Sequence, residues 1–184
     1  MPGSRRYFTP SRKAFHCTVK GRLYGASESR SRPVGVLTRC DGKRRYPFAE
    51  SVLDDERAPQ CGVHDCIVDV VEESGTSSYV VFFWIDDGEF SRFNRPASYV
   101  TPWPMYGDAL VMRLSKSKKF VVNMRHGDAV MADEVLERVA IAFNEHQGEL
   151  CPVYPASLRL HRKKMRSWRQ LMEAKKAWDR RQGC

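Results

Sequence analysis

Long apolar runs are missing from this chain of 184 residues. The longest, at residues 79–85, is far shorter than the roughly 18 residues that a membrane span requires. The N-terminus lacks the apolar core of a secretory signal, and the chain has no internal repeats. We therefore expect one ordered domain in a cytoplasmic or nuclear protein. An organellar location is the alternative, because the acid-free N-terminus contains the Arg and Ser typical of mitochondrial presequences.

A complete set of zinc ligands is also missing. The chain has six cysteines, but it is long enough to bury a core without disulfides, so we expect free thiols. Cys61, His64 and Cys66 place three potential metal ligands within six residues, yet no second Cys-x-x-Cys or His pair exists. We predict a loop that leads into a strand, with no metal and no cofactor. Metal binding by these three residues, completed from elsewhere in the chain, stays open.

The chain has no catalytic signature specific enough to name a reaction. Arg125-His126-Gly127 follows an apolar run and resembles, over three residues, the signature of the histidine phosphatases. That resemblance implies a phosphoryl group carried on His126. In that family the motif opens the domain and a second catalytic His follows, whereas here only 57 residues follow Gly127 and they have helical patterns. We therefore expect a strand-to-helix turn, in which Gly127 supplies an unusual φ and Asp128 caps the helix.

Basic charge is concentrated at the two ends of the chain. The net charge is +9, but residues 1–27 carry +6 and residues 156–184 carry +8, which leaves −5 in the middle. Basic terminal segments usually meet polyanions such as nucleic acid, anionic lipid or an acidic protein surface. Solvated ends that only keep the protein in solution are the alternative.

Strand-like patterns dominate the first two thirds of the chain. Residues 14–24 alternate as in a half-buried strand, and Asp41-Gly42 joins two strand-like runs as a hairpin turn. Residues 79–85 are apolar on both faces, which predicts a central strand. Other strands are expected at 66–71, 89–94, 109–114 and 120–125, with a stiff aromatic loop at 95–107.

Two helices are expected after the strands. Residues 128–147 place apolar side chains three and four apart on one face, and residues 157–181 form a basic amphipathic helix. The predicted fold class is α+β: a mainly antiparallel sheet of six to eight strands, curled toward a barrel, followed by two C-terminal helices. The predicted organisation is a flexible basic arm at 1–12, one domain at 13–150 and the basic helix at 151–184.

The C-terminal segment carries the main functional hypothesis, a non-enzymatic protein that binds nucleic acid through its basic ends. The predicted nucleic-acid-binding residues are Arg162, Lys163, Arg166, Arg169, Lys176 and Trp103. The alternative is a protein-interaction module that docks on an acidic partner or on a second copy of the chain. Its apolar contact residues would be Met165, Trp168, Met172 and Trp178.

A phosphoester hydrolase is a third and weaker interpretation. It would act through His126 or through the acidic turns at 54–56 and 86–89 together with Asp108. No DNA-binding motif is present, so sequence-specific recognition is not expected.

Overall fold

A computed structural model describes residues 15–40, 45–53, 63–73, 75–83, 92–146 and 157–161. The strands in these ranges are β1 (Phe15–Tyr24), β2 (Arg32–Cys40), β3 (Arg45–Pro47), β4 (His64–Glu72), β5 (Gly75–Phe83), β6 (Ala109–Leu114), β7 (Val121–Val122) and β8 (Ser157–His161). The helices are a 3-10 turn (Ala49–Ser51), α1 (Arg95–Val100) and α2 (Asp128–His146). None of these helices is long and apolar enough to cross a membrane.

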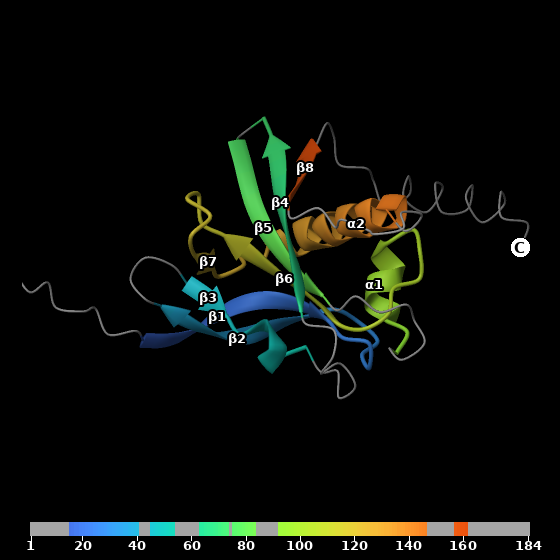
Figure 1. Cartoon of the computed structure of the whole chain (residues 1–184), viewed down its shortest axis with the longest axis horizontal. Coiled ribbons are helices and arrows are strands. Elements are labelled where there is room, and N and C mark those ends of the chain that lie inside the picture. Colours follow the sequence, from blue (N-terminus) through green and yellow to red (C-terminus); the bar gives the residue numbers. More distant parts are fainter. Residues whose placement is uncertain are drawn as a thin grey trace, which may run out of the picture.

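The strands form one mixed, mostly antiparallel sheet that curls into a half-barrel. Its order is β3-β2-β1-β6-β5-β4-β8, with β7 paired to β6, and only β8 runs parallel to its partner β4. The β1–β2 pair runs almost across the direction of β4 and β5 (Figure 1). A bridge between Arg45 and Phe120 links β3 to the chain just before β7. The curl therefore encloses an interior between β1–β3 and β5–β7.

The central strands β5 and β6 are buried on both faces. On one face, Val81 and Val111 belong to the core that α2 covers. On the other face, Val80 and Met112 belong to a second core inside the curl. A strand with both faces buried must be apolar without alternation. This confirms the central position predicted for the run that begins at Tyr79.

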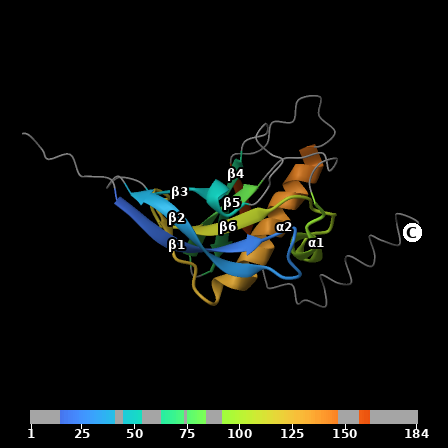
Figure 2. The ribbon, with the colours of Figure 1, turned by 90° about the horizontal axis from the view of Figure 1, so that it is seen from below.

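Helix α2 covers one face of the sheet through the apolar stripe that its sequence predicts. Ala132, Val135 and Leu136 are fully buried in the same core as Val81. Figure 2 shows the sheet from below, with the β1–β2 pair passing in front of β6 and α2. The helix predicted at 128–147 is confirmed.

The second predicted C-terminal helix is wrong where the structure describes it. Residues 157–161 form strand β8, and Leu158 packs against the core beneath α2. The pairing with β4 satisfies the backbone hydrogen-bonding groups of this segment. The spacing of residues within the sequence does not reveal this pairing. Residues 162–184 lie outside the described residues, so the rest of that prediction stays untested.

Three other local predictions need correction. Of the strand expected at 89–94 as the hairpin partner of β5, residues 92–94 are described, and they form only an isolated bridge between Phe93 and Tyr106. The expected loop at 95–107 begins with helix α1, and the expected strand at 120–125 shortens to β7. The β2–β3 hairpin is confirmed by its antiparallel pairing, whereas its predicted turn at Asp41-Gly42 lies outside the described residues.

Asn94 holds α1 against the end of the sheet. Its side chain is fully buried and makes three hydrogen bonds. The amide nitrogen donates to the carbonyls of Tyr24 and Gly107, at 2.7 and 2.6 Å. The amide oxygen accepts the N–H of Ala97 at 2.8 Å and so caps the helix.

We predict that Asn94→Ala lowers the free energy of unfolding by about 3 kcal/mol, because buried carbonyls lose their donors and the helix loses its cap. Urea denaturation measures this change. Arg95→Ala is the control, since Arg95 is exposed beside Asn94 and its loss should change stability by no more than about 0.5 kcal/mol. An equally small effect of Asn94→Ala would show that this network does not hold α1.

Candidate nucleic-acid interface

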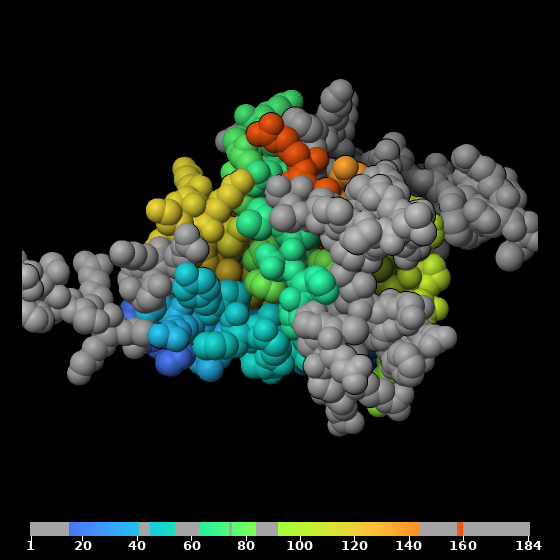
Figure 3. Space-filling view, viewed as in Figure 1, coloured from blue at the N-terminus to red at the C-terminus, as the bar shows by residue number. Residues whose placement is uncertain are grey.

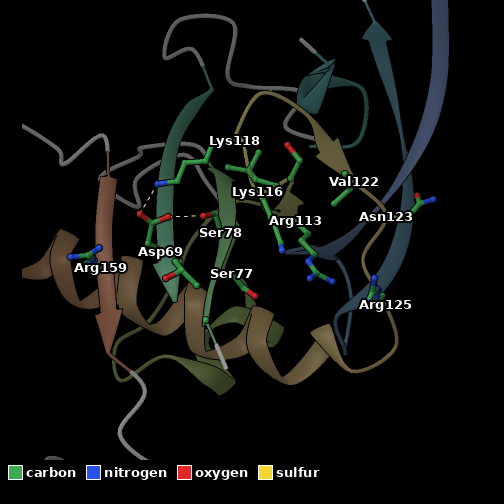
Figure 4. A pocket seen from close by; sticks show the side chains of 14 residues that line it. Asp69, Ser77, Ser78, Arg113, Lys116, Lys118, Val122, Asn123, Arg125 and Arg159 are labelled. Atoms are coloured by element: carbon green, nitrogen blue, oxygen red, sulfur yellow. Dashed lines mark hydrogen bonds and ion pairs between the residues drawn. The ribbon is translucent and has the colours of Figure 1, made fainter. Parts of the chain in front are cut away.

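A basic groove of about 870 Å³ lies between the first half of β5 and the turn that joins β6 to β7. In Figure 3 this turn (yellow) stands beside the ends of β4 and β5 (green). The cations that line the groove are Arg113, Lys116, Lys118, Arg125 and Arg159, and Asp69 is the only acidic side chain among the described residues of the lining. Its polar lining includes Thr76, Ser77, Ser78, Ser115 and Asn123. The side chains labelled in Figure 4 come from β4, β5, β6, β8 and the segments around β7.

The groove exists because β5 extends beyond β6. β4 pairs with β5 along residues 75–83, but β6 pairs only with residues 79–83. The chain then turns away after Leu114, so β6 pairing does not reach the β5 edge at residues 75–78. Among the described strands, none pairs with that edge, which lies beside the lysines of the turn, so its backbone groups can meet a ligand.

The β6–β7 turn is held in a defined shape by its own backbone. The N–H of Ser115 donates to Phe120 and the N–H of Lys118 donates to Ser115, both at 2.8 Å. Lys118 has a φ of 58°, a left-handed conformation that a residue other than glycine adopts at a cost. The turn thereby directs the Lys118 side chain across the groove to β4.

Asp69, at the wall of the groove, forms an ion pair with Lys118. Lys118 Nζ lies 2.6 Å from Asp69 Oδ2, and Ser78 Oγ donates to Oδ1 at 2.7 Å (Figure 4). Partial burial alone would raise the pKa of Asp69, but the hydrogen bonds from Lys118 and Ser78, with the charges of Lys118 and Arg159, hold it below its usual value. The one carboxylate of the lining is therefore ionised and already neutralised.

Asp128 positions the opposite wall. Its Oδ2 accepts the N–H of Arg125 at 2.7 Å and a bond from Arg113 at 3.2 Å, while Tyr79 donates to Oδ1. Burial, and then the Asp128 charge, raise the pKa of Tyr79, which keeps its hydroxyl protonated as a donor. Asp128 was expected as the N-cap that precedes the helix. It is instead the first residue of α2, and its side chain accepts a hydrogen bond from Arg125, which lies upstream. Gly127 does not have the positive φ that was expected.

Three groove cations keep their charge open to solvent. Lys116, Arg125 and Arg159 are exposed, and none has an ion-pair partner within the described ranges. The paired cations Arg113 and Lys118 lie between them in the lining. Close cations that share few counter-charges create a positive potential that attracts anions.

The residues predicted from the sequence to bind nucleic acid are not among the described residues that line the groove. Arg162, Lys163, Arg166, Arg169 and Lys176 lie outside the described residues, as do Met165, Trp168, Met172 and Trp178. Trp103 is half-buried in the segment after α1 and does not line the groove. The structure therefore does not bring Trp103 together with the groove cations, and the roles of all these residues stay predictions.

The residues considered for metal or phosphate chemistry do not form a site where the structure describes them. Cys66 is buried in the core, and burial, then the Asp65 charge, raise the pKa of its thiol to about 11. His64 stacks on Phe83, while Cys61 and the two acidic turns lie outside the described residues. In the described part of the chain, no three His, Cys, Asp or Glu side chains form a metal-binding group. His126 lies exposed in the turn before α2, outside the groove lining.

The groove was not predicted as a site from the sequence, although the sequence contains one signal for it. Lys116 and Lys118 alternate with Ser115 and Ser117 in a predicted turn, and Lys119 follows directly, a composition that suits phosphate contacts. The net negative charge of the middle segment concealed this local cluster. Arg159 was assigned to a helix, so its position beside Asp69 was not foreseen.

We predict that Lys118→Met raises the pKa of Asp69, because it removes the strongest contact that favours the ionised form. A carboxyl ¹³C NMR titration measures the change, and Lys116→Met is the control because Lys116 has no ion pair with Asp69. In the wild type the folded pKa lies below the unfolded value of about 3.9. The stabilisation from this pair is therefore present above that pH and lost as the pH falls through the folded pKa. An unchanged Asp69 pKa in Lys118→Met would contradict the geometry.

Comparisons with protein-family models, with curated proteins and with solved structures find no match for the chain. What the groove can bind is therefore argued from its own lining. Cations around hydroxyl groups and an open strand edge suit the phosphate oxygens of an extended anion.

Proposed function

We propose that the protein is a non-enzymatic binding protein that engages nucleic acid through the basic groove. The observation that carries the proposal is the charge of the described lining: Arg113 and Lys118 are paired with carboxylates, whereas three further cations have no ion-pair partner among the described residues. A concave surface of one sign focuses the potential and raises the local concentration of polyanions. Phosphate contacts of this kind supply most of the affinity of nucleic-acid binding that does not depend on sequence.

The shape of the groove supports an extended ligand. Lys116 and Arg125 lie on the segments around β7, whereas Arg159 lies on β8, beyond β4. Hydroxyls of Thr76 and Ser77 lie in the same lining, and such groups commonly donate to phosphate oxygens. A backbone with regularly spaced phosphates can therefore contact several of these groups at once.

The basic C-terminal segment extends this proposal. Arg162 directly follows β8, the strand that carries Arg159. The segment with the five predicted cations between 162 and 176 therefore starts directly after a strand that lines the groove. We retain them as additional phosphate contacts, with the described groove as the main site.

The alternative is a protein-interaction module that binds an acidic partner or a second copy of the chain. The observation in its favour is the position of β8, which lies at one end of the sheet and pairs only with β4 among the described strands. An edge strand offers backbone donors and acceptors to a strand from another chain. Such association depends less on salt than phosphate binding does.

We predict that the full-length double variant Lys116→Gln/Arg125→Gln binds a labelled oligonucleotide about tenfold more weakly than the wild type. The slope of log affinity against log salt should fall by about 2, since two phosphate contacts are lost. Fluorescence anisotropy across a salt series measures both quantities. The double variant Arg92→Gln/Arg95→Gln removes the same charge at exposed positions near α1 and should leave the slope unchanged.

A second full-length variant separates the groove from the C-terminal segment. It carries Gln at 162, 163, 166, 169 and 176 and keeps β8, which a truncation at residue 155 would remove. Binding that falls only in this variant would contradict the groove as the main site. An equal loss in the Arg92/Arg95 control would show that net charge alone controls binding.

A further inference from the structure

The outer face of β1, β2 and β3 exposes apolar and aromatic side chains to solvent. We use "outer face" for His16, Lys20, Leu37, Arg39, Tyr46 and Phe48. The side chains that alternate with them, such as Val19 and Val36, point into the core inside the curl. Tyr46, Leu37 and Phe48 are 46%, 45% and 37% exposed. Large apolar groups grouped this way on a sheet face indicate a binding surface.

Strand register places these side chains in two adjacent rows. In one row Arg39 faces His16 of β1 and Tyr46 of β3. In the next row the N–H of Phe48 donates to Leu37 at 2.8 Å, so Phe48 continues the pairing beside β2. The rings of His16 and Phe48 stack with centroids 6.0 Å apart and planes 28° apart. The rings of His16 and Phe48 therefore form a stacked pair, and Tyr46 lies in the adjacent row on the same face.

The charge of these three strands selects the kind of partner. β1, β2 and β3 contain no Asp or Glu at all. Their cations are Lys20, Arg22, Arg32, Arg39 and Arg45. Lys20 and Arg39 are exposed on the outer face beside the aromatic rings. Aromatic rings interleaved with cations, without acids, match the bases and phosphates of a nucleic acid.

We propose that the outer face binds single-stranded nucleic acid by stacking unpaired bases on Tyr46 and Phe48, with Lys20 and Arg39 contacting phosphates. This inference rests on the proposed function and adds to it the class of nucleic acid. A duplex hides the faces of its bases within the helical stack, so only an unpaired strand can use the rings. Stacking does not read sequence, which agrees with the lack of a sequence-reading motif.

The groove and the outer face adjoin along β1. Asn123, which lines the groove, accepts the N–H of Lys20 at 2.8 Å through its side chain. The N–H of Met124 donates to the carbonyl of Lys20 at 3.0 Å. The segment that carries Asn123 and Arg125 therefore lies against the strand that carries Lys20. One strand of nucleic acid can contact the groove and continue onto the outer face.

The test compares single-stranded oligothymidylate of about 12 nucleotides with a duplex of the same length, using the full-length protein. The variant Tyr46→Leu/Phe48→Leu removes both rings but keeps apolar side chains, so that the fold is preserved. Single-strand affinity should fall about tenfold for each ring lost, while duplex affinity stays within about twofold. Tyr99→Leu is the control, because Tyr99 is exposed on α1 away from this face and should change neither affinity.

Two results would overturn the inference. One is that the wild type binds both the single strand and the duplex, and that Tyr46→Leu/Phe48→Leu leaves the single-strand affinity unchanged. The other is an equal loss of single-strand and duplex affinity. If the wild type binds neither ligand at low salt, the proposed function itself fails, so the two failures are distinguishable.

A second measurement does not depend on any variant. Oligothymidylate containing 5-iododeoxyuridine is cross-linked to the wild-type protein by light, and the attached peptide is identified by mass spectrometry. Cross-links on the peptide that contains Tyr46 and Phe48 support the inference. Cross-links found only on other peptides contradict it.

Discussion

The pairing of β5 with β6 is the constraint on which the rest of the structure depends. Both strands are buried on both faces, so each contributes to the core under α2 and to the core inside the curl. Val81 pairs with Val111 and Val80 pairs with Met112, which places one pair in each core. Burial of apolar area is the main favourable term in folding. The helix and the β1–β3 layer are therefore held on opposite sides of the same two strands.

The candidate site follows from where this pairing stops. β5 continues past the end of β6, and the chain that leaves β6 must turn beside the unpaired part of β5. That turn carries the lysines, and Asp69 and Asp128 each hold one cation of the groove in place. Asp69 forms its ion pair with Lys118, and Asp128 forms its ion pair with Arg113. The remaining cations keep a positive surface, whose potential attracts anions.

The sequence predicts the helices and strands better than it predicts which strands pair with one another. Residues 79–85 and 128–147 have a composition and a period that only a buried strand and an amphipathic helix explain. Strand β8 also alternates, with Leu158 and Leu160 separated by Arg159, but the longer helical spacing that follows concealed this short pattern. Its parallel pairing with β4 joins segments far apart in the chain, which periodicity does not encode. The groove lysines were missed because net charge was averaged over the whole middle of the chain.

The most direct test of the account maps the ligand on the folded domain. Amide chemical shifts of the ¹⁵N-labelled full-length protein are followed by NMR while oligothymidylate is added. We expect the largest changes at residues 75–78, 115, 116, 118, 123 and 125, which line the groove. Changes confined to residues 162–184, or to the α1 end of the domain, would contradict the account.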